Sequence, residues 1–188
     1  MIPAPAPAPP PPGSAAWTHA LQLYALPGVA PACLLLQDRL GVDVTVLLFA
    51  MHRGRHGAGV AAADLAAWDD TVRGWRAEVV RPLRQMRRAL KASLAGAAPA
   101  RTAAVRDKVA AAELAAEQVS FDLLEDARTV PLASVGQLDP DEIPRAVALH
   151  FARSSGRAKQ VLADPAIQQA LDRVARAARE LASTPPGS

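Results

Sequence analysis

The chain has 188 residues, of which 51% are hydrophobic and only 4% aromatic, and its formal net charge is +3. This length predicts one domain with a sizeable core and excludes a large multidomain architecture. Alanine and leucine dominate, and these residues cost least in a helix while strands prefer β-branched and aromatic residues, so the composition predicts an all-α protein.

Residues 1–13, MIPAPAPAPPPPG, are rich in proline and alanine. Proline removes backbone donors and fixes φ, and the segment has no apolar periodicity, so we expect a disordered tail with polyproline II character. It has neither the basic nor the apolar region of a secretory signal. We expect a single helical domain over 14–182, a disordered C-terminus over 183–188, a cytoplasmic location and no membrane insertion.

Three helices are predicted in the first third of the chain. Ser14 can cap the first, Gly41 can terminate the second, and the carboxylate of Asp43 can accept the free N–H groups of the third. The third helix is apolar almost all round, so it should be central. The predicted ranges are 14–26, 29–40 and 44–53.

The second helix carries polar residues within the most apolar part of the chain. Asp38 projects opposite the apolar stripe of this helix, so we expect it to be partly buried. A buried carboxylate is costly unless paired, and the nearest candidates are arginines of residues 73–91. The candidate polar cluster consists of Gln37, Asp38 and Asp43.

A long helix is predicted over 68–94, with a kink at Pro82 because proline removes one backbone hydrogen bond. Its basic residues project away from the apolar stripe and should form a basic ridge, defined here as Arg73, Arg76, Arg84, Arg87, Arg88 and Lys91. Residues 113–126 are acidic and contain no lysine or arginine, so two oppositely charged helices can instead face each other.

Three further helices complete a compact bundle of about six or seven. The helix over 101–128 has an apolar stripe, and two others begin at Asp139-Pro140 and Asp164-Pro165, each read as a cap followed by a first-turn proline. The last helix has a narrow apolar seam suited to a partner helix. The stripe consists of Val105, Val109, Ala112, Ala116, Val119 and Leu123, and the seam of Ile167, Leu171, Val174, Ala178 and Leu181.

Three blocks of sequence resemble a family of short, uncharacterised proteobacterial helical proteins, a domain of unknown function. The resemblance implies a bacterial cytoplasmic helical protein and supplies no reaction; Thr45 and His52 depart from the family pattern. The blocks contain Leu23-Tyr24, Pro27-Gly28-Val29, Ala32-Cys33-Leu34, Leu36-Gln37-Asp38, Gly41-Val42-Asp43-Val44 and Leu47-Leu48-Phe49, then Trp75, Val79-Val80, Pro82-Leu83-Arg84, Arg87-Arg88 and Leu90-Lys91, and last Glu113-Leu114 and Ala116-Glu117.

Motifs of catalysis are weak. His52 and His56 have helical metal-ligand spacing, but glycines surround them and no further ligand lies nearby, so we expect no metal and no cofactor. Cys33, the lone cysteine, points along a core stripe and is expected to be a buried packing residue in a reducing compartment.

The main functional prediction is a non-catalytic interaction or accessory protein that presents the basic ridge to a protein partner. One alternative is a nucleic-acid or ribosome-associated binding protein. The other is a small-molecule enzyme with a polar pocket around Gln37 and Asp38.

Overall fold

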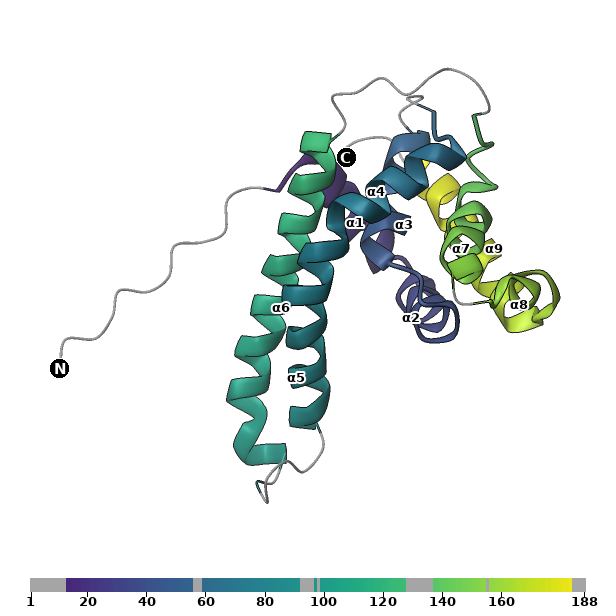
Figure 1. The fold of residues 1–188 in the computed structure, drawn as a ribbon. Coiled ribbons are helices and arrows are strands. Elements are labelled where there is room, and N and C mark those ends of the chain that lie inside the picture. The colour runs from purple at the N-terminus through teal and green to yellow at the C-terminus, as the bar shows by residue number, and fades with distance from the viewer. Residues whose placement is uncertain are drawn as a thin grey trace.

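The computed structural model describes residues 13–55, 59–91, 97, 99–127, 137–154 and 156–183. Every regular element in these ranges is helical, which confirms the all-α prediction (Figure 1). The expected tail 1–12, His56 and the final residues 184–188 lie outside the described ranges. The elements are α1 (Ala15–Ala25), α2 (Val29–Leu40), α3 (Val44–Arg55), α4 (Ala62–Trp75), the π-helix η1 (Arg76–Val80), α5 (Arg81–Lys91), α6 (Pro99–Ala127), α7 (Ile143–Ser154), α8 (Ala158–Ala163) and α9 (Pro165–Ser183).

The predicted capping residues fix the first three helices. Ser14 accepts the N–H of Trp17 (3.2 Å), and Gly41 ends α2 in the left-handed conformation, with φ of 75°. Asp43 Oδ1 accepts the N–H groups of Thr45 (2.8 Å) and Val46 (3.3 Å) at the start of α3. As predicted, α3 is central, with every residue from 46 to 52 buried, although it continues to residue 55 rather than ending near 53.

The long helix predicted over 68–94 begins earlier, at α4, where Asp64 accepts the N–H of Ala61 (2.7 Å). The predicted kink at Pro82 takes the form of η1, in which the N–H of Arg81 bonds to the carbonyl of Arg76, five residues earlier. This wider turn accommodates a residue that has no N–H and whose ring crowds the preceding turn. The chain changes direction between α4 and α5 without a break (Figure 1).

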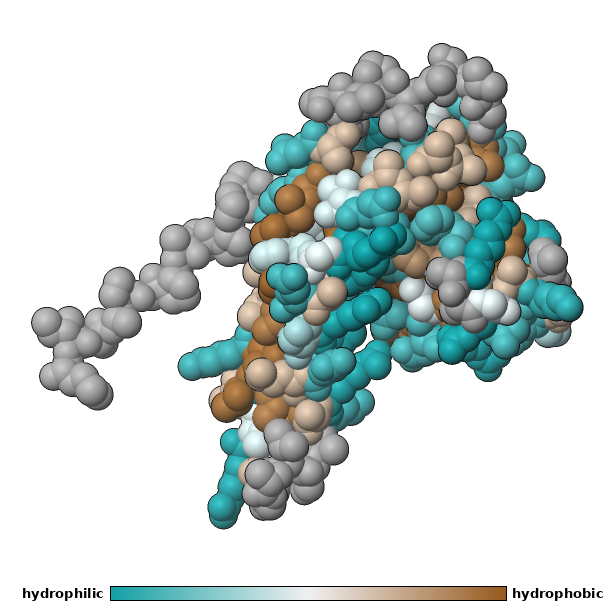
Figure 2. Space-filling model, in the orientation of Figure 1, coloured by the Kyte–Doolittle hydropathy of each residue, from teal (hydrophilic) through white to brown (hydrophobic). Residues whose placement is uncertain are grey.

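Helices α5 and α6 lie side by side as an antiparallel arm that projects from the other helices (Figure 1). The predicted apolar stripe of α6 was wrong: of its six members only Ala116 is buried, and Val105 and Val119 are exposed. The buried row instead runs through Glu113, Ala116, Ser120 and Leu124, because α6 turns its glutamates toward the arginines of α5. Apolar residues therefore cover the outer side of α6 (Figure 2).

The C-terminal helices pack on α2 and α3, opposite the arm. Asp164 accepts the N–H of Ala166 and caps α9, as predicted, and the seam of α9 packs largely against α2 of the same chain. The predicted helix start at Pro140 was wrong, because residues 140–142 form a turn and α7 begins at Ile143. Ser183, expected in the C-terminal tail, is the last residue of α9.

Candidate functional site

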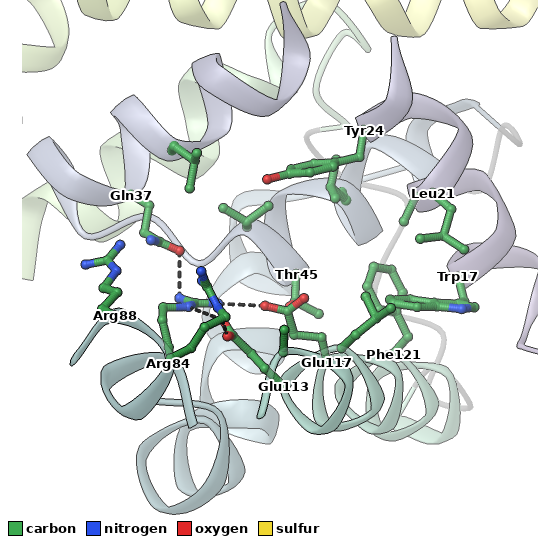
Figure 3. A pocket seen from close by; sticks show the side chains of 17 residues that line it. Trp17, Leu21, Tyr24, Gln37, Thr45, Arg84, Arg88, Glu113, Glu117 and Phe121 are labelled. Carbon is green, nitrogen blue, oxygen red and sulfur yellow. Dashed lines mark hydrogen bonds and ion pairs between the residues drawn. The ribbon is translucent and has the colours of Figure 1, made fainter. Parts of the chain in front are cut away.

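Arg84 joins three helices at the base of the arm. Its Nε donates to Glu113 (2.9 Å) and its Nη2 to Glu117 (2.7 Å), both on α6, while its Nη1 donates to Oε1 of Gln37 on α2 (2.6 Å). The Arg84 side chain is 23% exposed and that of Glu113 only 7%. All three nitrogens of this guanidinium are thus held within the protein (Figure 3).

The two glutamates have opposite electrostatic environments. Burial opposes ionisation of Glu113, but hydrogen bonds from Arg87, at 2.5 Å, and from Arg84 outweigh it and lower its pKa. Burial dominates at Glu117, so its pKa is raised despite the ion pair with Arg84. Burial likewise raises the pKa of the nearby Tyr24 phenol.

A second ion-pair group lies one helical segment away, at the start of η1. Arg76 donates through Nη1 to Oδ2 of Asp43 and through Nη2 to Oδ1 of Asp69, each at 2.6 Å. His150 and Phe151 of α7 complete this group, the imidazole at 3.3 Å from Asp69 and the ring beneath the guanidinium of Arg76. Asp43 therefore caps α3 and anchors η1 at the same time.

An amphipathic cavity of about 240 Å³ opens between α1, α2, α3, α5 and α6. Its apolar half and its polar half lie on opposite sides, with Arg84 at the base of the polar half (Figure 3). The apolar half includes Trp17, Leu21, Tyr24, Leu34, Leu48, Leu114 and Phe121, and the polar half Gln37, Thr45, Arg84, Arg87, Arg88, Glu113 and Glu117.

A polar cavity of about 300 Å³ lies on the other side of Arg84, at the corner between α2 and α3. Gln37, Thr45, Arg84 and Arg88 line both cavities, so the two adjoin. The polar cavity is further lined by Asp38, Gly41, Val42, Asp43, Arg76, Val80, Arg81, Gln85 and Ser120.

The residues of the basic ridge do not behave as one surface. Arg76 and Arg84 are turned inward, Arg87 pairs with Glu113, and Arg73 pairs with Asp70, while Lys91 is exposed. Hydrophilic residues cover the side of α5 that faces α2 (Figure 2). The basic helix α5 and the acidic part of α6 face each other, which is the arrangement predicted from their opposite charges.

The predicted polar cluster is brought together around the polar cavity, with one correction. Asp38 pairs with an arginine of the predicted segment, Arg88, at 3.3 Å, but its side chain is 60% exposed and is not buried. It lies near the C-terminal end of α2, where the helix surface faces open solvent beside the arm. The pairing of Asp38 with Arg88 follows from their opposite charges. The exposure of Asp38 depends on how the neighbouring helices pack around it, which the sequence does not give.

Sequence reasoning missed the individual roles of Glu113, Glu117, Trp17 and Tyr24. The two glutamates are four residues apart and their partners Arg84 and Arg87 are three apart, and this spacing is the signal that indicates adjacent, paired helix faces. His19 is buried, with its ring 5.2 Å from that of His52. Cys33 is buried as predicted, and burial raises its pKa to about 12.

The geometry defines a small helical protein with an amphipathic cavity whose base is an internal ion-pair network. The chain belongs to the family described as "Protein of unknown function (DUF2390)", whose model matches residues 15–124. No curated protein and no solved structure matches the chain.

Every residue that lines either cavity falls within the matched range, so both cavities belong to the family domain. Helices α7 to α9 lie outside that range and support α2 and α3 from the other side. Among the described residues no group of three His, Cys, Asp or Glu side chains is placed to hold a metal ion. No single helix in the described ranges is long and apolar enough to cross a membrane; α1 and α2 pass that test only as a pair bent by 100°.

Proposed function

We propose that the domain over residues 15–124 binds a small organic molecule with an apolar body and one polar end in the amphipathic cavity. The observation that carries this proposal is the division of the cavity into an apolar half and a polar half (Figure 3). Ligand sites in proteins are typically concave, mostly apolar and supplied with a few placed polar groups.

The apolar half supports the proposal through the side chains that it leaves in contact with water. Leu21, Leu34 and Leu114 are 46%, 44% and 50% exposed and all line this cavity. A ligand that covers apolar surface gains about 25 cal/mol per Å². The aromatic rings of Trp17 and Phe121 pack edge-on at 5.3 Å beside them, which supplies a stiff wall.

The polar half supports the proposal through its rigidity. Arg84 and Glu113 hold each other and neighbouring groups in place before any ligand arrives, which reduces the entropy lost on binding. Arg87 and Arg88 stand at the edge of the same cavity with part of each guanidinium accessible to solvent. They are suited to hold a polar or anionic end of the ligand.

This proposal replaces the basic ridge as the principal feature, because most of its arginines are engaged in ion pairs within the domain. The roles in protein partner binding and in nucleic-acid binding remain predictions. The small-molecule alternative at Gln37 gains support from the cavities that this residue lines, although the proposal is for binding and names no reaction.

The test is a fluorescence titration with 1-anilinonaphthalene-8-sulfonate, which has an apolar body and one anionic group. We expect saturable binding of one probe per chain. Leu34→Gln removes apolar wall worth about 1.5 kcal/mol and should weaken binding about tenfold. The matched control is Val105→Gln on α6, because Val105 is 52% exposed and lines neither cavity.

Both variants should unfold at the same urea concentration as the unmodified protein, because both positions are well exposed. Equal binding by the two variants would place the probe elsewhere and reject the proposal. Failure of the unmodified protein to bind the probe saturably would also reject it.

A further inference from the structure

One face of α5 borders the polar cavity. Arg84, Gln85 and Arg88 follow Arg81 by three, four and seven residues, so all four share a face of this helix, and all four line the cavity. The opposite wall is the corner between α2 and α3, from Gln37 to Thr45. The cationic face of α5 is therefore directed at a hollow in the protein.

Arginines outnumber carboxylates among the lining residues, and Asp69, Glu113 and Glu117 beside the lining pair with two of these arginines. Four arginines line it, Arg76, Arg81, Arg84 and Arg88, against two carboxylates, Asp38 and Asp43. Asp43 is fully occupied, since its Oδ1 caps α3 and its Oδ2 accepts from Arg76. Its carboxylate therefore has little capacity to neutralise the other arginines.

Two of the four arginines remain accessible to a ligand. Arg76 and Arg84 direct their terminal nitrogens to carboxylates and an amide within the protein. Arg88 makes a single 3.3 Å contact with the well-exposed Asp38, a geometry that stabilises little in water. Arg81 is exposed and makes no ion pair with the other described residues.

We infer that the polar cavity binds a phosphate group carried by a small polar molecule, with Arg81 and Arg88 as its cationic ligands. A guanidinium presents paired N–H donors that match two phosphate oxygens. The two guanidinium groups together carry two positive charges, which match a doubly charged phosphate. Gln37, Gln85 and Thr45 supply neutral hydrogen-bonding groups for the rest of the molecule.

The size of the cavity favours an organic phosphate over the free ion. A site for one water needs about 10–15 Å³ of the same kind of volume, and this cavity has about 300 Å³. Free phosphate therefore fills only part of it, and a short hydroxylated carbon chain fits beside the phosphate group. The site adjoins the amphipathic cavity and differs from it in Arg81 and Gln85, while Gln37, Thr45 and Arg88 contribute to both.

The test is calorimetric titration at constant ionic strength with three probes: glycerol 3-phosphate, inorganic phosphate and glycerol. We expect saturable, one-to-one binding of glycerol 3-phosphate, weaker binding of inorganic phosphate and none of glycerol. Tighter binding of inorganic phosphate than of glycerol 3-phosphate would overturn the assignment of an organic phosphate. Absence of saturable binding by both phosphates would overturn the site itself.

The variants Arg81→Gln and Arg88→Gln should each weaken binding of glycerol 3-phosphate about tenfold, because each removes a charge-assisted contact. The matched control is Arg73→Gln, since Arg73 is exposed, lies in an ion pair and lines neither cavity. Equal losses in Arg81→Gln and Arg73→Gln would show only a general charge effect and would overturn the inference. Urea midpoints of all three should match the unmodified protein.

The two sites are separated by crossing the variants. Leu34→Gln should leave binding of glycerol 3-phosphate unchanged, and Arg81→Gln should leave binding of the anilinonaphthalene probe unchanged, because each residue lines only one cavity. If the unmodified protein binds glycerol 3-phosphate but not the anilinonaphthalene probe, the proposed function is rejected and the phosphate site stands. If it binds the probe but not glycerol 3-phosphate, the phosphate site is rejected and the proposed function stands.

Discussion

Replacement of Arg84 by alanine removes the residue that joins α5 to both α6 and α2. Breaking a buried ion pair from one side costs about 3–5 kcal/mol, but Arg84 is 23% exposed and Glu113 keeps its contact with Arg87. We therefore expect a loss of about 3 kcal/mol in the free energy of unfolding. For a chain of this size that corresponds to roughly 6–12 °C in Tm.

The loss should depend on pH because the variant leaves two carboxyl groups without their shared cation. The lowered pKa of Glu113 gives stability that is present above its unfolded pKa and lost as the pH falls through its folded pKa. The raised pKa of Glu117 has the opposite sign, so its contribution is present at low pH and lost as the pH rises through its folded pKa. Removal of Arg84 raises both pKa values, so the destabilisation should be largest near pH 8 and shrink toward about pH 4.

Urea unfolding of the Arg84→Ala variant and the unmodified protein at several pH values measures this difference directly. The control is Arg88→Ala on the same helix, whose exposed pair with Asp38 should contribute less than about 1 kcal/mol. A loss below 1 kcal/mol for Arg84→Ala, or a loss that is constant from pH 4 to pH 8, would refute the role of Arg84 as the centre of a buried network.

Four further predictions concern single side chains. Glu113→Gln should destabilise the protein by about 2–4 kcal/mol in urea unfolding, because Arg87 loses this ion pair and Arg84 keeps only the one with Glu117; a loss below 1 kcal/mol would contradict the pairing. Asp43→Ala should cost about 2–4 kcal/mol, and Asp43→Asn should cost less because an amide oxygen can still cap α3; equal losses would exclude a capping contribution. Asp38→Ala should change the urea midpoint little, since its pair is exposed. The thiol of Cys33 should react with iodoacetamide at pH 8 only after unfolding, because it is buried with a pKa raised to about 12; rapid labelling of the folded protein would refute its burial.

The parts of the fold that follow from a few neighbouring residues could be predicted from the sequence. Ser14, Gly41 and Asp43 each act on backbone groups within four residues, so their capping roles depend on local geometry alone. The central position of α3 also follows from composition, since a helix that is apolar all round has to be covered on every side. The polar cluster at Gln37 could also be predicted from composition, because its polar residues interrupt an apolar segment.

The orientation of α6 could not be predicted, because its faces differ little in hydrophobicity. Alanines lie all round this helix, so a stripe of valines was as plausible a core face as the row through Ala116 and Leu124. The choice between them was made by Glu113 and Glu117, which face the arginines of α5 across the arm. An interaction between residues 26 or more positions apart is not visible in the periodicity of either segment.

The basic ridge was the clearest charge pattern in the chain. Its arginines have different roles because the π-helical turn η1 makes them point in different directions. A regular α-helix from 68 to 94 places every residue on one continuous helical phase, but the π-helical turn at 76–80 shifts the residues after it relative to those before. Arg76 consequently points to Asp43 and Asp69 beside α7, while Arg84 points to Gln37 and the glutamates of α6. The hollow between these two groups is the polar cavity, which both arginines line. Pro82, read in the sequence only as a point of bending, is thus the residue that favours the wider turn and with it the hollow that the two arginines line.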